Sequence, residues 1–176
     1  MNSAFIIVGA GGHARVVADA LLCAGGRVLG FIDADATLHG RCVLDLPVLG
    51  GDDALARHDP REVQLVNGIG GVEAGPSLRE RVQARLQTQG WRFAGVRHPA
   101  AVVAASAVIG EGCQLLAGSV LQPGASLATG SIVNTGAVVE HDCRVGAWNH
   151  IAPRALLCGG VHTGEFVHVG AGAVLR

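Results

Sequence analysis

The sequence contains no tyrosine and no lysine, and its formal net charge at pH 7 is only -1. A chain this close to neutrality offers no strong charge to attract nucleic acid or an anionic membrane surface. All thirteen basic residues are arginine, which we read as a compositional bias without functional weight. The apolar run at residues 5–8 is too short for a membrane span or a signal peptide, and no basic residue precedes it. We therefore expect a cytoplasmic protein with neither nucleic-acid nor membrane partners.

Paired cysteine motifs are also missing. The five cysteines are scattered at positions 23, 42, 113, 143 and 158, and no CxxC spacing occurs among them. Such scattered thiols favour reduced cysteines over a disulfide framework or a structural zinc site.

What the sequence does contain, from residue 103 onward, is a period of six. One column is aliphatic except at Thr163, and a second column two residues earlier is mostly small. The aliphatic column is Val103, Ile109, Leu115, Leu121, Leu127, Val133, Val139, Val145, Ile151, Leu157, Thr163, Val169 and Leu175. Glycine recurs in a third column, at 112, 118, 124, 130, 136, 160 and 172. This period fits neither a helix nor an alternating strand, and it predicts a solenoid in which three short strands make one turn.

The first part of the chain has a different pattern. An apolar strand at 5–8 ends in the glycine turn 9–13, a helix follows, and a second strand is expected at 27–32. Backbone N–H groups at such a turn suit a phosphate, although the same turn also serves simply to pack a helix on a strand. Asp33 stands at the carboxyl end of the second strand, where ligands bind in open parallel sheets. Its carboxylate either accepts hydrogen bonds from the ribose or base of a ligand, or is a solvated cap of the loop.

A further strand is expected at 63–66, followed by a helix that starts at Ser77 with capping-box spacing and ends at Gly90. Leu78, Val82 and Leu86 would line its apolar face, and a strand over 91–96 would lead into the solenoid. Ala14 replaces the third glycine of a full dinucleotide-binding motif. We therefore predict a Rossmann-like α/β half domain over 1–95 and a parallel β-helix over 96–176.

Polar residues interrupt the solenoid at Asn134, at Glu140-His141-Asp142, and at His150. A neutral imidazole suits general-base work near pH 7, and a neighbouring carboxylate can fix its tautomer. The alternative is a solvated histidine at a corner. His162 and His168 stand one repeat apart, on different faces of a coil, and we expect no metal ion.

Three segments carry a resemblance to a known family: the glycine turn ending in His13, Phe31-Ile32-Asp33, and residues 134–143 followed by His150. Over nearly its whole length the sequence resembles the hexapeptide-repeat sugar acyltransferases, typified by bacterial nucleotide-aminosugar N-acetyltransferases of the bacillosamine and perosamine type and by sialic-acid O-acetyltransferases. The resemblance implies a left-handed coil, acetyl-coenzyme A as co-substrate, a nucleotide-linked amino sugar as acceptor, and a homotrimer with active sites between subunits.

The resemblance also implies residue roles. His141 would be the general base of a direct transfer, and Asp142 would raise its basicity. Residues meeting acetyl-coenzyme A would be His150, Gly159 and Ala171. Residues of the nucleotide-sugar pocket would be Gly11, Gly12, His13, Asp33 and Gly70.

Two alternatives stay open from the sequence. The acceptor could be a sugar hydroxyl, as in sialic-acid O-acetylation, because the same base serves either group. The chain could also bind a nucleotide sugar without catalysis, since it stops at Arg176 where relatives of this type continue through one or two more coils. We expect a shortened C-terminus and a weakened coenzyme A groove.

Overall fold

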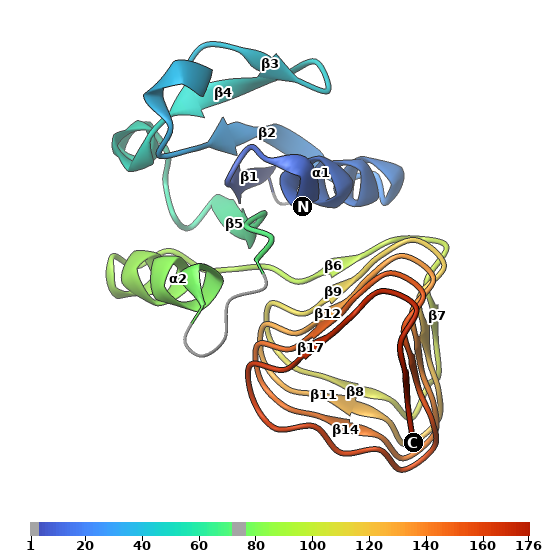
Figure 1. Ribbon diagram of the computed structural model, residues 1–176. Helices are drawn as coiled ribbons and strands as arrows, with labels where there is room; N and C mark the ends of the chain where they lie inside the picture. The colour runs from blue at the N-terminus through green and yellow to red at the C-terminus, as the bar shows by residue number, and fades with distance from the viewer. Residues whose placement is uncertain (1–3, 72–76) are drawn as a thin grey trace.

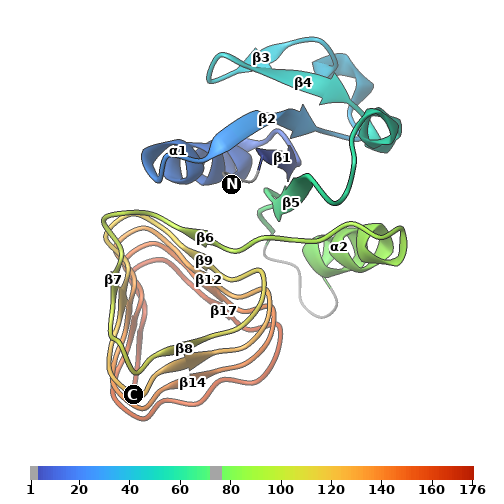
Figure 2. The same cartoon turned by 180° about the vertical axis from the view of Figure 1, so that it is seen from behind.

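The computed structural model describes residues 4–71 and 77–176 (Figure 1). An α/β part packs against one side of a triangular coil of short strands, and the opposite view shows the same two parts (Figure 2). Among the described residues, no helix is long and apolar enough to cross a membrane.

The α/β part is built on a largely parallel sheet with strand order β3-β4-β2-β1-β5. Its strands are β1 (Ala4–Val8), β2 (Arg27–Ile32), β3 (Cys42–Val43), β4 (Leu46–Gly50) and β5 (Val63–Asn67). The central strand β1 pairs in parallel with both β2 and β5, and helix α1 (Gly12–Cys23) connects β1 to β2. The expected strands at 5–8, 27–32 and 63–66 are confirmed, and most of their residues are buried, as expected for central strands of a parallel sheet; Arg27 is exposed and Gln64 half-buried.

Two features of this sheet were not expected. Strands β3 and β4 form an antiparallel hairpin, and β4 extends the parallel sheet beside β2. Two short 3₁₀ helices, η1 (Ala36–Leu38) and η2 (Asp52–Arg57), flank the hairpin. The hairpin has a largely exposed outer strand, which gave no apolar run to read in the sequence.

Helix α2 (Leu78–Thr88) begins as expected, with the Ser77 side chain accepting the N–H of Glu80 at 3.3 Å. The apolar face expected for this helix is only partly buried. Leu86 is fully buried, but Leu78 is 45% exposed. The other buried residues of the helix are Arg79 and Gln83.

The strand expected over 91–96 is wrong as a continuous element. Phe93 forms only an isolated bridge to Leu65, and Trp91 is buried in the core of the α/β part. Strand pairing with the coil starts at β6 (Val96–Arg97), which pairs with the strand one turn further on.

The coil follows the predicted period. Its strands have two residues each and form three parallel sheets. The first sheet contains β6, β9 (Gln114–Leu115), β12 (Ile132–Val133), β15 (His150–Ile151) and β17 (His168–Val169). The second contains β7 (Val102–Val103), β10 (Val120–Leu121), β13 (Val138–Val139), β16 (Leu156–Leu157) and β18 (Val174–Leu175). The third contains β8 (Val108–Ile109), β11 (Ser126–Leu127) and β14 (Arg144–Val145).

The three sequence columns have three distinct places in this coil. The aliphatic and small columns form one buried cluster along its axis, with Ile109 left 40% exposed in the first turn. The third column lies at the corners with φ between about 58° and 74°. Glycine reaches that region without strain. Four non-glycine residues of the coil adopt it too, and these are Asp142, Trp148, Arg154 and Phe166.

Polar side chains join the α/β part to the coil. The Arg79 guanidinium donates to the Gly130 carbonyl and lies 5.5 Å from the ring centre of Trp148. Gln114 Nε2 donates to the Asn67 carbonyl at 2.5 Å. Because these two donors are buried and bond to specific partners, they fix how the two parts face each other.

Candidate active site

The His141–Asp142 pair lies on an exposed corner of the coil, directly after β13. His141 Nδ1 is 2.9 Å from Asp142 Oδ2, and the two side chains are 64% and 74% exposed. Because the carboxylate can only accept, Nδ1 carries the proton and Nε2 keeps its lone pair. The arrangement leaves one imidazole nitrogen able to take a proton from a reactant.

Gly159 lies one turn further along the coil, directly beside that imidazole. A Cβ added at Gly159 would fall 2.5 Å from His141 Nε2, so only glycine leaves the present ring position open. The Gly159 N–H has no hydrogen-bond partner among the residues that the structure describes. The free N–H of Gly159 can donate a hydrogen bond to an oxyanion. The free nitrogen of His141 beside it can accept a proton from a reactant.

His150 lies on a different side of the coil and is held neutral. Asn134 Oδ1 accepts the N–H of Thr135 at 2.7 Å, which leaves Asn134 Nδ2 to donate to His150 Nε2 at 2.9 Å. His150 therefore has its proton on Nδ1. Burial, reinforced by the nearby His13, His168 and Arg79, lowers the pKa of His150 to about 4.

His13, at the start of α1, faces the same side of the coil. Its Nε2 lies 2.7 Å from Gln114 Oε1, and burial lowers its pKa. The ring centres of His13 and His150 are 6.2 Å apart, and His168 contacts the other side of His150 at 5.0 Å. The three rings form a row from the α/β part across the coil surface. Neither Gln114 nor His168 was expected in the site. The partner of Gln114, His13, is 101 residues away in the chain, whereas His168 stands one eighteen-residue turn after His150, so the repeat itself could have shown that neighbour.

The residues expected for a nucleotide-sugar pocket do line one cavity. It has a volume of about 490 Å³, and Gly11, Gly12, His13, Asp33 and Gly70 all contribute to its wall. A second cavity of about 470 Å³ shares Gly12, His13 and Gly70 with it and continues to Asn134 and His150. Together the two cavities lead from the glycine turn to the coil.

Asp33 has a clear local role in this wall. Its two carboxylate oxygens accept the backbone N–H groups of Ala10 at 2.7 Å and Asp35 at 2.8 Å. The carboxylate therefore ties the glycine turn after β1 to the end of β2.

The described contacts form two groups that do not meet within one chain. His141 contacts Asp142 and Gly159 at the corner that follows the second sheet. The row around His150 lies on the first sheet. Ala171 is exposed at the corner between β17 and β18.

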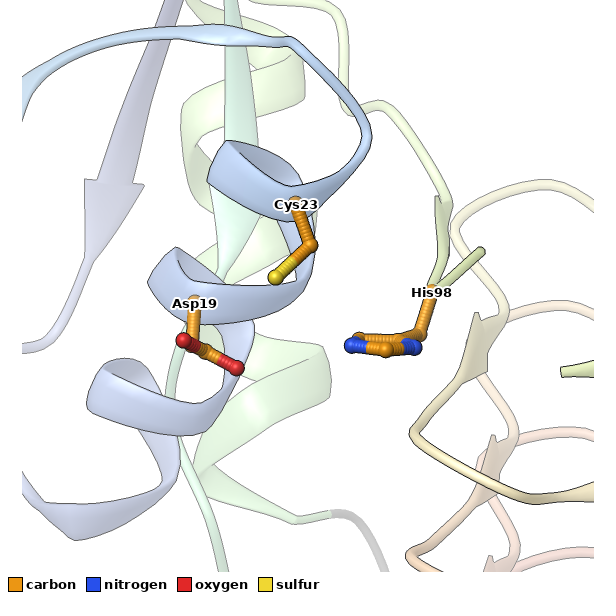
Figure 3. A group of neighbouring side chains, drawn as sticks. All are labelled: Asp19, Cys23 and His98. Carbon is orange, nitrogen blue, oxygen red and sulfur yellow. The ribbon is translucent and has the colours of Figure 1, made fainter. Parts of the chain in front are cut away.

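One further group of side chains has the chemistry of metal ligands. Asp19 and Cys23 lie one turn apart on α1, and His98 points toward them from the start of the coil (Figure 3). Their ligand atoms lie within 4.8 Å of one another. His98 Nδ1 accepts the N–H of Ala100 at 2.9 Å, so the neutral ring carries its proton on Nε2. A metal on Nε2 would have to displace that proton and this hydrogen bond, and we assign no ion there.

Comparison with known proteins places this geometry in context. Residues 4–86 match a family model described as the PglD N-terminal domain. The acetyltransferase domain of PglB from Neisseria gonorrhoeae FA1090 is 33% identical with a TM-score of 0.88, over 99% of this chain and 83% of that chain. A second structure of that domain, 32% identical, is a complex with acetyl coenzyme A. No curated protein matches the chain.

Another similar structure is a histidine-to-asparagine variant of perosamine N-acetyltransferase from Caulobacter crescentus, in complex with CoA and GDP-perosamine. It is 34% identical with a TM-score of 0.87, over 99% of this chain and 89% of that chain.

Proposed function

Because this chain belongs to the bacillosamine- and perosamine-type acetyltransferases, which use acetyl-coenzyme A, we propose that it N-acetylates the amine of a nucleotide-linked amino sugar. The observation that carries this proposal is the exposed His141–Asp142 pair with its free nitrogen over Gly159. The complex of the similar perosamine enzyme with a nucleotide-linked amino sugar supports the acceptor class.

The proposed reaction is a direct transfer. The sugar amine attacks the thioester carbonyl carbon, and His141 Nε2 takes the proton that the amine loses. Asp142 stabilises the resulting imidazolium through Nδ1–H. The tetrahedral intermediate then collapses, the carbon–sulfur bond breaks, and the imidazolium returns the proton to the coenzyme A thiolate. No covalent enzyme intermediate forms.

The remaining coil residues would hold the thioester. The free N–H of Gly159 would donate to the oxyanion, an interaction worth about 3 kcal/mol for one donor in other enzymes. His150, which burial keeps neutral and Asn134 holds in one tautomer, would contact coenzyme A near the acetyl group. Ala171, at an exposed corner further along, would contact the pantetheine arm.

The α/β part, residues 1–95, would bind the nucleotide sugar, and residues 96–176 would form the catalytic left-handed β-helix. Gly11, Gly12, His13, Asp33 and Gly70 line one cavity, which supports a single pocket for the nucleotide. The second cavity leads toward His150, where the sugar end could reach the coil.

A homotrimer would complete the site. The groups around His141 and His150 lie on different sides of one coil, so a site using both needs a neighbouring chain. The second sheet also carries an aliphatic stripe on its outer face, made of Val102, Val120, Val138, Leu156 and Val174. Val102 and Val174 are 62% and 57% exposed in the single chain. Val120, Val138 and Leu156 between them are half-buried, and an aliphatic stripe that stays partly exposed along a whole sheet favours association with further copies.

Acetyl transfer is tested by release of free thiol from acetyl-coenzyme A. The purified protein is incubated with UDP-, GDP- and CMP-linked sugars, with and without a free amine on the sugar. We expect thiol release with an amino sugar and none with its hydroxyl counterpart. Release only with the hydroxyl sugars would replace N- by O-acetylation, and no release from a folded protein would favour a binding protein.

The site between chains is tested by mixing two inactive variants. His141→Ala and His150→Ala are each expected to lose activity by orders of magnitude, whereas His162→Ala, another exposed coil histidine, should retain it. After subunit exchange at equal ratio, about a quarter of the sites receive both native histidines from two different chains. Recovery to about a quarter of wild-type activity supports the intersubunit site. A mixture as inactive as its components contradicts it.

A further inference from the structure

The cavity beside the glycine turn ends in a feature that the proposed roles leave unused. Asp52, at the start of η2, and Arg85, on α2, both line this cavity of about 490 Å³. Arg85 Nη1 lies 2.5 Å from Asp52 Oδ2, and the two side chains are about half exposed, at 47% and 44%. An ion pair thus connects the two sides of the cavity.

The walls next to this pair are apolar. Ile32 and Ala34 come from the end of β2, Ile69 follows β5, and Leu78 and Val82 come from α2. A flat heteroaromatic ring can pack between such walls while its polar edge meets the ion pair. A nucleobase has this shape and this chemistry.

The second carboxylate near the cavity is already engaged. Both oxygens of Asp33 accept backbone N–H groups, from Ala10 and Asp35. Asp52, by contrast, has Arg85 as its only side-chain partner among the described residues. Asp52 is therefore the carboxylate better able to accept hydrogen bonds from the edge of a base.

The hydrogen-bonding edges of the bases decide which one fits best. Guanine presents an acceptor, O6, next to two adjacent donors, N1–H and the N2 amino group. A carboxylate accepts two adjacent donors at once, while a guanidinium donates to the neighbouring acceptor. Uracil offers a single donor between two acceptors, and adenine offers one amino donor beside an acceptor, so neither fills both carboxylate oxygens.

We propose that Asp52 and Arg85 form the base-reading end of the cavity and select a guanine nucleotide. Asp52 accepts from N1–H and N2–H, and Arg85 donates to O6. The inference rests on the proposed function, because it takes the ligand of this cavity to be a nucleotide.

The test measures binding of free nucleoside diphosphates by calorimetry. The probes are GDP, UDP, ADP and inosine diphosphate, which is guanine-like but lacks the N2 amino group. We expect GDP to bind more tightly than UDP and ADP, and more tightly than inosine diphosphate by about 10-fold for the second hydrogen bond to a carboxylate.

The decisive variant is Asp52→Asn, which keeps the side-chain shape and removes the charge and one acceptor. We expect GDP affinity to fall about 10- to 100-fold, while UDP affinity changes much less. The preference for GDP over inosine diphosphate should vanish. The matched control is Asp53→Asn, the neighbouring exposed acid that does not line the cavity, and its GDP affinity should equal that of wild type.

The outcomes separate the inference from the function on which it rests. Tighter binding of UDP or ADP, equal binding of GDP and inosine diphosphate, or an Asp52→Asn variant with unchanged GDP affinity would overturn the guanine assignment alone. Absence of binding by all four nucleotides would likewise overturn the guanine assignment, and absence of thiol release with every UDP-, GDP- and CMP-linked amino sugar would overturn the nucleotide-sugar function on which it rests.

Discussion

Adding one methyl group at Gly159 should separate activity from stability. In Gly159→Ala the new Cβ would fall 2.5 Å from His141 Nε2 and 2.6 Å from Cε1, against 3.4 Å for ordinary contact. The imidazole must therefore move by about 0.9 Å. A displacement of about 1 Å at a catalytic group costs roughly 10²-fold in rate. The φ of Gly159 is not in the left-handed region, and the ring is an exposed side chain, so the fold should tolerate the change.

The assay is thiol release from acetyl-coenzyme A with the best amino-sugar acceptor of the panel, alongside thermal unfolding. We expect kcat to fall about 100-fold and Tm to stay within about 2 °C of wild type. Gly164→Ala is the matched control, because its Cβ meets nothing within 4 Å and its φ is ordinary. Undiminished turnover in Gly159→Ala would refute the placement of His141 Nε2 at the reaction centre.

Two further predictions concern stability. The pKa of His150 is about 4 in the folded chain against an ordinary 6.5, so the unfolded chain binds the extra proton and the free energy of unfolding should fall as pH drops from 7 to 4. Urea unfolding at pH 7 and pH 4 should show that the free energy of unfolding falls by about 2 kcal/mol because of His150, and this part of the fall should be absent in His150→Gln. A wild-type free energy of unfolding that does not change with pH would contradict the burial of His150. Gly130→Ala combines a φ of 70° with a Cβ 2.5 Å from the Trp148 ring and should cost about 3 kcal/mol or more. Gly160→Ala has a similar φ of 72° but open space and should cost only about 1 kcal/mol, so equal losses would show that the Trp148 contact is unimportant.

The coil could be predicted from the sequence because its information is local. Each turn buries one aliphatic and one small residue per side, and each repeat therefore reports its own environment. The short central strands of the sheet were readable for the same reason. The β3–β4 hairpin was not, because its outer strand is exposed and buries no apolar run.

Helix α2 shows where local patterns fail. The sequence predicts that Leu78 is buried and gives no reason to bury Arg79, yet the exposures are 45% and 2%. Arg79 can be buried because Gly130 accepts from its guanidinium and Trp148 packs near it. Both partners are more than fifty residues away in the chain, where no local pattern reports them.

The candidate site also contains both local and long-range contacts. His141 and Asp142 are adjacent in sequence, so their pairing followed from the sequence, whereas Gly159 was expected only from the family resemblance and the structure places it beside the His141 ring. His13 lies 101 residues from Gln114, and only packing of the α/β part on the coil brings them within 2.7 Å.

The sequence by itself thus determined the repeat, the inward columns, the glycine turn and the adjacency of His141 and Asp142, because each depends on residues that are close along the chain or related by a fixed period. Only the tertiary structure decided the placement of His13 beside Gln114 and His150, the two joined cavities and the Asp52–Arg85 pair. These depend on how one packed surface meets another, and that orientation is set by buried hydrogen bonds between residues far apart in the sequence.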